Sequence, residues 1–231
     1  MKAFDKLPVH VGLIMDGNGR WAQKKHMPRS FGHNAGMNTM IKLASHASGL
    51  GIKYLTVYTL STENLSRPQD ELDGLFALFR GYFKTNVKKL YKKGAAVKII
   101  GDISPLPDDV QTLLKEGESG SPADAEFTLV FAINYGARSE IVRAVNLAVE
   151  RGEKVTESDF AATLYTGGIP DPDLIIRTGG EVRLSNFLTY QAAYSELYFT
   201  DVLFPDFGTR EFDKALKEYE RRDRRFGKIK K

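Results

Sequence analysis

The chain has 231 residues, of which 42% are hydrophobic and 27% are charged, the balance of a folded domain with a sizeable core. The absence of cysteine excludes a disulfide framework, a thiolate zinc site and a cysteine nucleophile, and no apolar run is long enough to span a bilayer. The net charge of +4 and the pI near 9.1 favour an anionic partner: a phosphate ester, a nucleic acid or an acidic membrane surface.

The first predicted element is a buried strand over residues 9–15, an apolar and partly β-branched run that ends at Asp16. Gly17, Asn18 and Gly19 follow it, and glycines after a buried strand let backbone N–H groups approach a ligand closely. A helix that starts there adds partial positive charge, so the turn suits a phosphate, with Asp16 available to hold Mg²⁺. An ordinary strand-to-helix turn with a capping aspartate is an equally fair interpretation.

Strands and helices then alternate along the chain. Further strands are predicted at residues 54–60, 96–100, 127–133 and 173–177, with a last one through Leu197 and Phe199. Helices are predicted over residues 34–48, 66–93, from 104 onward, 138–151, 156–165, 186–194 and 209–225, with Ser66 and Gln69 as a capping pair. We therefore predict one α/β domain over residues 1–231, with a mostly parallel sheet of about six strands flanked by helices on both faces.

Polar side chains gather after three of these strands. The candidates are Asp16 to Arg20, Trp21, Arg29 and His33 after the first strand; Ser61 to Asn64 and Arg67 after the second; and Arg177, Arg183 and Ser185 after the fifth, with Glu196 near the last. Because parallel strands end at one edge of a sheet, we expect these groups to converge, and arginine forks suit phosphate oxygens. Each residue alone has a plainer role as an ion pair, a cap or a structural histidine, so only their joint occurrence favours function.

Other chemistries find little support in the sequence. The motifs GxxxxGK[ST], HExxH and GxSxG are absent, and GNGRWA lacks the third glycine of GxGxxG. No aromatic and basic strand of an RNA reader occurs, and we expect no nucleic-acid partner.

Five segments are distinctive when taken together: HVGLIMDGNGRWA, RSFGHNAG, YTLSTENLSRP, IIRTGGEVRLSNFL and AAYSELYFTDVLFPDF. They resemble the cis-prenyltransferase family, and within it the bacterial undecaprenyl diphosphate synthases, over residues 9–227. The resemblance implies Mg²⁺-dependent condensation of isopentenyl diphosphate units onto farnesyl diphosphate. The implied product is undecaprenyl diphosphate, the lipid carrier precursor for cell-wall synthesis.

The resemblance also assigns roles to residues. It implies that Asp16 is an essential acid working with Mg²⁺, that Glu196 is a second metal-linked carboxylate, and that Asn64 is the catalytic proton acceptor. An amide is a poor base, so we expect Asn64 to orient the substrate while a diphosphate oxygen or water takes the proton. The implied substrate-binding residues are Gly17, Asn18, Gly19, Arg20, Trp21, Arg29 and His33; Arg177, Arg183, Leu184 and Ser185; and, in a mobile covering segment, Ser61, Thr62, Glu63, Leu65 and Arg67.

Further implications concern the product and the partners. The aromatic face of residues 72–90, opposite residues 127–133, would line an apolar tunnel, although the same pattern fits plain core. The family's pattern implies a cytoplasmic homodimer in which Arg225, Phe226 and Gly227 reach the partner's site, with transient contact at the inner membrane surface during product release.

Three alternatives stay open: another product length, a non-catalytic subunit of such an enzyme, and a protein that binds phosphate esters or nucleic acid. Intact Asp16 and Arg20 argue against the second alternative. Leu60 and Leu65 stand where many relatives have Phe and Trp, which could alter closure over the substrates.

Overall fold

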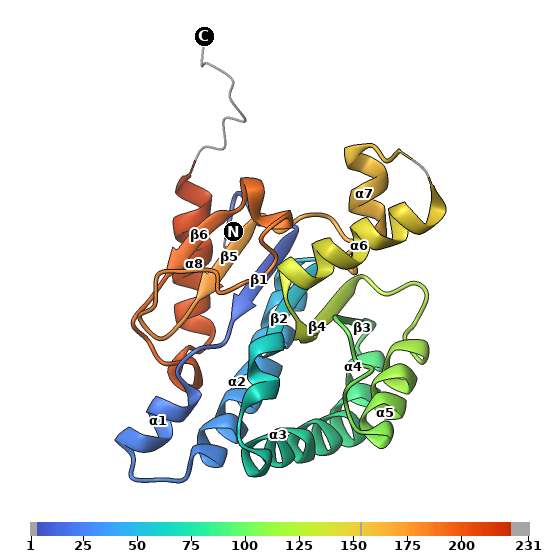
Figure 1. Cartoon of the computed structure of the whole chain (residues 1–231). Helices are drawn as coiled ribbons and strands as arrows, with labels where there is room; N and C mark the ends of the chain where they lie inside the picture. The colour runs from blue at the N-terminus through green and yellow to red at the C-terminus, as the bar shows by residue number, and fades with distance from the viewer. Residues whose placement is uncertain (1–3, 153, 223–231) are drawn as a thin grey trace.

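Six strands form one wholly parallel sheet in the spatial order β3-β4-β2-β1-β5-β6 (Figure 1). The computed structural model describes residues 4–152 and 154–222. The strands are β1 (His10–Ile14), β2 (Tyr54–Ser61), β3 (Ala95–Ile100), β4 (Phe127–Tyr135), β5 (Leu174–Arg177) and β6 (Glu196–Phe199). The predicted sheet is confirmed, and the bounds of each strand lie within two residues of the prediction.

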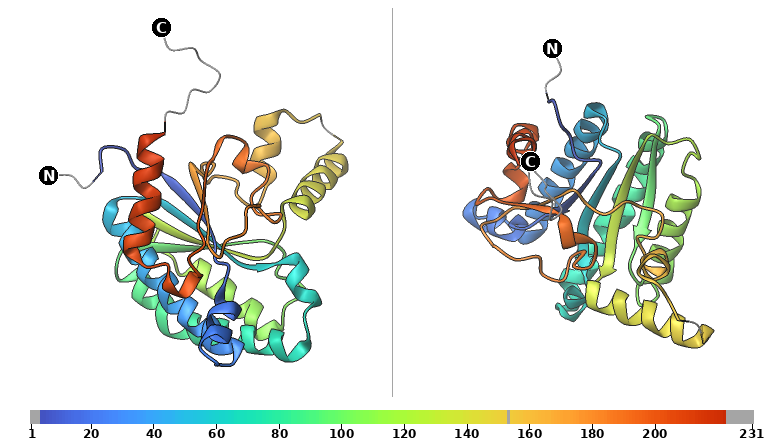
Figure 2. Two further views of the ribbon diagram at one scale, coloured as in Figure 1. Left: turned by 90° about the vertical axis from the view of Figure 1, so that its left-hand side faces the viewer. Right: turned by 90° about the horizontal axis from the view of Figure 1, so that it is seen from above.

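Helices cover both faces of this sheet (Figures 1 and 2). One face carries α2 (Arg29–Leu50), α3 (Gln69–Tyr82), α4 (Lys88–Tyr91), α5 (Asp108–Ser119) and α8 (Thr209–Arg221), and the other carries α6 (Ala137–Arg151) and α7 (Glu157–Thr163). Because side chains alternate along a strand, Leu55 and Val57 enter the larger core under α2 and α3, while Tyr58 faces the smaller core beside α6. The central strands β1 and β5 are buried along their whole length, as their continuous apolar runs require.

Several helix boundaries differ from the prediction. The helix α2 starts at Arg29, five residues early, and ends at Leu50, two residues beyond the predicted end, where Gly51 adopts a φ of 90° and returns its N–H to the last turn. The helix α5 starts at Asp108, after Pro107, and not near residue 104. A short helix α1 (Asn18–Lys24) follows the glycine turn.

The predicted helix over residues 66–93 is three pieces: α3, the π-helical turn η2 (Phe83–Val87) and α4. The predicted capping pair at its start is wrong, because Ser66 belongs to a separate 3-10 turn, η1 (Thr62–Ser66), and donates to the carbonyl oxygen of Glu63. Arg67 is extended, as expected for a residue before proline.

The predicted helix over residues 186–194 is also shorter. Ser185, Asn186 and Leu188 have positive φ, which is incompatible with a helix, so only the 3-10 turn η3 (Gln191–Tyr194) forms. In the described part of the chain, no helix combines the length and the apolar character that a membrane span requires.

Candidate functional site

The carboxyl ends of β1 and β5 lie side by side, with Ile14 in register with Arg177. The chain leaves β1 toward β2 on one side and returns to β5 on the other side. Such a reversal opens a crevice at the carboxyl edge of a parallel sheet, where ligands of this fold class bind. Asp16 follows β1 and Arg177 ends β5, so a carboxylate and a guanidinium meet at this point.

The turn after β1 is built around glycine. Gly17 has a φ of 109°, and a Cβ there would lie 2.8 Å from a side-chain carbon of Leu203, so other residues are excluded by both conformation and space. On the β5 side, Gly179 has a φ of 84°, and a Cβ there would lie 2.6 Å from Nη2 of Arg20. Glycine at both turns therefore allows the two loops to approach each other closely.

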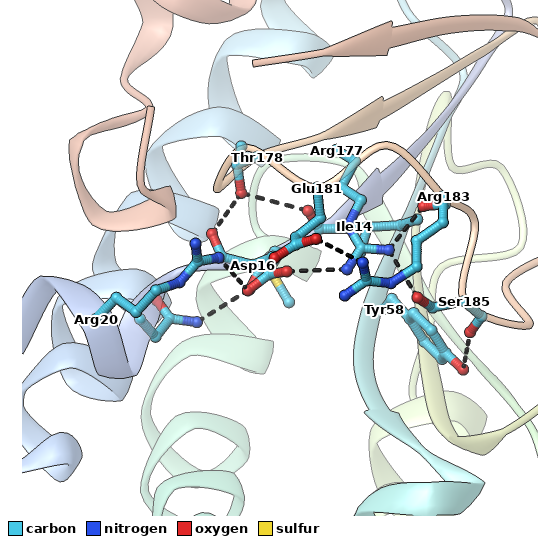
Figure 3. Close-up of polar contacts among 11 residues, drawn as sticks. Ile14, Asp16, Arg20, Tyr58, Arg177, Thr178, Glu181, Arg183 and Ser185 are labelled. Atoms are coloured by element: carbon cyan, nitrogen blue, oxygen red, sulfur yellow. Dashed lines mark hydrogen bonds and ion pairs between the residues drawn. The ribbon is translucent and has the colours of Figure 1, made fainter. Parts of the chain in front are cut away.

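Asp16 is held between two arginines (Figure 3). Its Oδ1 accepts a hydrogen bond from Nη2 of Arg20 at 3.0 Å, and its Oδ2 accepts one from Nη2 of Arg177 at 2.9 Å. The Arg177 side chain is only 5% exposed, and its Nη1 also donates to the carbonyl oxygen of Arg183 and to Oγ of Ser185. The buried guanidinium thus ties the end of β1 to the loop after β5, a linkage typical of Arg forks.

These side chains open onto a cavity of about 630 Å³. The cavity is lined by ten of the predicted residues: Asp16, Asn18, His33, Ser61, Glu63, Asn64, Arg67, Arg177, Arg183 and Ser185. Its wall also contains Tyr58 and Asn186, which the sequence analysis did not single out. The Tyr58 hydroxyl donates to the carbonyl oxygens of Tyr135 and Ser185, and so holds the loop after β5 against β4.

A second group of charges lies where α2 meets α3. Nη1 of Arg67 lies 2.8 Å from Oε1 of Glu71, and Nη2 of Arg29 lies 3.9 Å from the same oxygen. Burial lowers the pKa of His33, with further lowering by Arg67 and Arg29 and partial opposition by Glu71. Its Nε2 is buried with no hydrogen-bond partner among the described residues. This ring nitrogen is therefore available to form a hydrogen bond with a ligand.

The segment after β2 folds back on itself. The Ser61 N–H donates to Oδ1 of Asn64 at 3.1 Å, and the two residues form a capping box around η1. Asn64 therefore does act as a capping residue, as the simpler interpretation of the sequence expects. Its side chain also lines the cavity. Burial raises the pKa of Glu63, but hydrogen bonds from its own backbone and from the side chains of Ser61, Asn186 and Thr62 lower it below its ordinary value.

Other predicted residues lie outside the cavity. Glu196 opens β6, level with Leu174, whereas Arg177 is level with Phe199 three residues further, about 10 Å along the strand. Glu196 instead accepts a hydrogen bond from Arg222 at 2.9 Å. The structure therefore does not bring Glu196 together with Asp16, because Glu196 begins its strand while Asp16 follows one.

Three more predicted binding residues pack elsewhere. Trp21 donates its indole N–H to Asp206 at 2.8 Å, and the ammonium of Lys25 lies 4.6 Å from its ring centre. Leu65 packs against the larger core and Leu184 against the smaller one. The predicted motif Arg225, Phe226 and Gly227 lies outside the described residues.

A small apolar cavity of about 50 Å³ adjoins the main one beneath Met15 and Leu75. Its walls come from α2, α3 and β4, and include Met40, Phe79 and Phe131. A cavity of this size has room for only a water or two. The open apolar tunnel that we expected is not shown by the described residues, and it stays a prediction.

The residues at the crevice fit a magnesium ion that is shared with a ligand. Among residues 4–152 and 154–222, no group of three or more His, Cys, Asp or Glu side chains could enclose a metal. Mg²⁺ is commonly held by one or two carboxylates together with substrate phosphates and water. Within the described residues, each oxygen of Asp16 accepts one charged hydrogen bond and keeps capacity for a cation. Asp16 is therefore the candidate protein ligand.

Comparisons with known proteins find close matches over nearly the whole chain. The sequence profile of the Prenyltransf family, described as "Putative undecaprenyl diphosphate synthase", matches residues 14–227. An isoprenyl transferase of Fusobacterium nucleatum subsp. nucleatum is 48% identical over 97% of this chain and 97% of that protein. A ditrans,polycis-undecaprenyl-diphosphate synthase of Micrococcus luteus, specific for (2E,6E)-farnesyl diphosphate, is 45% identical over 96% of this chain and 92% of that protein.

A solved structure is similar as well. Lavandulyl diphosphate synthase from Lavandula x intermedia, in complex with dimethylallyl diphosphate, is 37% identical. It superposes with a TM-score of 0.91, covering 96% of this chain and 99% of that one.

Proposed function

This chain belongs to the prenyltransferase family of undecaprenyl diphosphate synthases, and from that premise we propose that it elongates farnesyl diphosphate with isopentenyl diphosphate units. The observation that carries the proposal is the Asp16–Arg177 pair at the crevice between β1 and β5, beside a cavity of about 630 Å³. An acid and several arginines around one cavity are what two diphosphates and one cation require.

The two diphosphates would bind on opposite sides of Asp16. The allylic diphosphate meets the N–H groups of the Gly17–Gly19 turn, the start of α1 and the guanidinium of Arg20, with Arg29 and His33 further out. Isopentenyl diphosphate meets Arg177, Arg183 and Ser185 on the loop after β5. Asp16 lies between the two groups because it bonds to Arg20 with one oxygen and to Arg177 with the other.

The chemistry needs no side-chain nucleophile. The bond between the allylic carbon and the diphosphate oxygen breaks, the oxygen keeps the electron pair, and the double bond of isopentenyl diphosphate supplies the pair for the new carbon–carbon bond. Arg20 and the backbone N–H groups stabilise the charge that develops on the leaving diphosphate, and alignment of the two substrates removes much of the entropic barrier.

A proton then leaves the condensed intermediate and a Z double bond forms. Asn64 would orient the isopentenyl group, because its amide is fixed by the Ser61 N–H and an amide does not accept protons readily. A diphosphate oxygen or water is the acceptor. Mg²⁺ held by Asp16 would neutralise charge on the leaving group when bound.

The finer assignments extend this proposal. We propose that the product is undecaprenyl diphosphate, because the Micrococcus luteus relative is named for the synthesis of that compound, and that this product serves cell-wall synthesis. The protein would act in the cytoplasm as a homodimer, with residues 225–227 near the partner's site and with transient contact at the membrane surface for product release. Glu196 would serve as a metal-linked carboxylate only in such an assembly, since within one chain it begins β6 and Asp16 lies beyond the other end of the sheet's strands.

The first experiment is a product assay. The purified chain is incubated with farnesyl diphosphate, labelled isopentenyl diphosphate, Mg²⁺ and mild detergent, and the products are resolved by length. A ladder ending at eleven isoprene units supports the proposal, and another end point selects a different product length. No incorporation with or without Mg²⁺ would point to a non-catalytic subunit.

A further inference from the structure

The loop after β5 makes a contact that the roles above do not use. Asn186 directly follows Ser185 and has a φ of 65°, a left-handed conformation that asparagine tolerates better than most residues. It lies in the cavity wall, between η1 and the start of α6.

The polar groups of Asn186 connect three segments of the chain. Its Oδ1 accepts the N–H of Arg138 at 2.9 Å, and its carbonyl oxygen accepts the N–H of Ala137 at 2.8 Å. These are the first N–H groups of α6, which the helix cannot satisfy itself, and Gly136 at the cap position has no side chain to do so. The Asn186 Nδ2 donates to Oε1 of Glu63 in η1 at 3.1 Å.

The orientation of this amide is fixed by its partners. A backbone N–H can only donate and an ionised carboxylate can only accept, so the oxygen faces Arg138 and the nitrogen faces Glu63. Gly136 permits the approach, because a Cβ there would lie 2.6 Å from Nδ2 of Asn186 and 2.8 Å from Oγ1 of Thr62.

We propose that Asn186 is a positioning residue that couples closure of the covering segment, residues 61–67, to the isopentenyl diphosphate clamp. Arg183 and Ser185 bind the diphosphate, Asn186 is the next residue, and its amide holds Glu63 over the cavity. Order in the clamp therefore stabilises the covering segment. The inference rests on the proposed function, which supplies the ligand that the clamp would bind.

The test is Asn186→Asp. Aspartate also tolerates the left-handed conformation and keeps the acceptor for Arg138, but it replaces the donor with a carboxylate oxygen that faces Glu63. Hydrogen–deuterium exchange of residues 61–67 in the free protein is expected to rise about tenfold, because one charge-assisted hydrogen bond becomes a repulsion. Exchange at the start of α6 and the melting temperature should stay near those of the wild type.

Two further variants sharpen the result. Adding Glu63→Gln to Asn186→Asp restores an amide–carboxylate hydrogen bond with reversed polarity, so exchange of residues 61–67 should recover to within about threefold of the wild type. Asn146→Asp adds the same charge at an exposed position of α6 and should leave exchange unchanged.

The coupling itself is read with isopentenyl diphosphate. The ligand is expected to slow exchange of residues 61–67 in the wild type but not in Asn186→Asp, and KM for isopentenyl diphosphate should rise about tenfold with a smaller change in kcat. Equal exchange of residues 61–67 in wild type and Asn186→Asp, or equal protection by the ligand, overturns the inference. A wild type that makes no product overturns the proposed function instead, while the exchange of the free protein still decides the Asn186–Glu63 contact.

Discussion

The two ends of strand β1 use polar residues in opposite ways. At the carboxyl end, Asp16 is shared by Arg20 and Arg177, and its side chain lines an open cavity. At the amino end, His10 is 1% exposed, with Nδ1 2.6 Å from the carbonyl oxygen of Pro170 and Nε2 2.7 Å from the hydroxyl of Thr56. A carbonyl can only accept, so Nδ1 carries the proton and Nε2 accepts from Thr56.

The difference separates function from stability. The polar groups of His10 are fully used inside the protein, so the residue contributes to holding the sheet together. Asp16 keeps unused hydrogen-bonding capacity toward the cavity, which stability alone does not require. Substitutions at the carboxyl end should therefore reduce activity and leave the fold intact. Substitutions at the amino end should reduce stability and leave activity nearly unchanged.

The largest expected effect is at Asp16. Asp16→Ala should lower kcat about 1,000-fold, because the charge between the two diphosphate sites is lost. Arg177 keeps its bonds to Arg183 and Ser185, so the protein should still fold, as circular dichroism would report. Asp124→Asn, at an exposed position, is the matched control, and product formation near the wild-type rate in Asp16→Ala would refute the role.

Because of His10 at the amino end of β1, we expect the free energy of unfolding to depend on pH. Burial lowers the pKa of His10 from 6.5 to about 4, with smaller opposing contributions from the Pro170 carbonyl and from Asp173. Above pH 6.5 the His10 ring is mostly neutral in the folded and in the unfolded protein. Between pH 6.5 and about 4, the unfolded chain binds a proton at His10 that the folded chain does not. The free energy of unfolding should therefore fall by about 3 kcal/mol from this residue as the pH drops from 6.5 to 4.

Urea unfolding at several pH values checks this contribution against His10→Asn, which keeps a donor for Pro170. The difference between wild type and variant should shrink as the pH falls, while activity at pH 7.5 stays within about threefold. Parallel stability curves for the two proteins between pH 7 and 5 would contradict the assignment.

A smaller effect is expected at Arg183, whose side chain is 58% exposed and paired with Glu181. Arg183→Ala should raise KM for isopentenyl diphosphate about 30-fold through loss of one charge-assisted contact, without a change in melting temperature. Steady-state kinetics that give an unchanged KM at unchanged kcat would remove Arg183 from the clamp.

The smallest effect concerns an unpaired hydroxyl. Tyr82 is 4% exposed, its hydroxyl has no partner among the described residues, and burial raises its pKa. Tyr82→Phe removes that unsatisfied group and should leave the free energy of unfolding unchanged or raise it by about 1 kcal/mol. A loss of more than about 1 kcal/mol in thermal or urea unfolding would show that the hydroxyl is satisfied in solution.

The strands and the family resemblance could be predicted because both rest on local patterns. Buried runs such as residues 127–133 are readable from the chain alone, and the comparisons confirm the resemblance of the five segments. The meeting of Asp16 and Arg177 followed from strand polarity, since both come at carboxyl ends.

The remaining features depend on long-range structure. Glu196 was expected at the site because it lies near a strand, but only the register of β6 shows that it starts that strand. Asn186 was missed because its partners, Glu63 and Arg138, are far away in sequence. The break at η2 and the positive φ of Ser185 likewise depend on neighbours that a local pattern does not contain.

The strand order also sets when the site can exist during synthesis. β1 lies between β2 and β5, and about 160 residues separate Ile14 from Leu174. At 5–20 residues per second, the ribosome needs roughly 10–30 s to supply the second neighbour. During that time the edge of β1 that later meets β5 is open to incorrect pairing, and Asp16 lacks Arg177. The candidate site is therefore among the last parts of the nascent chain to assemble. A ribosome stalled before residue 174 would hold a partial sheet in which Asp16 and Arg177 have not yet met.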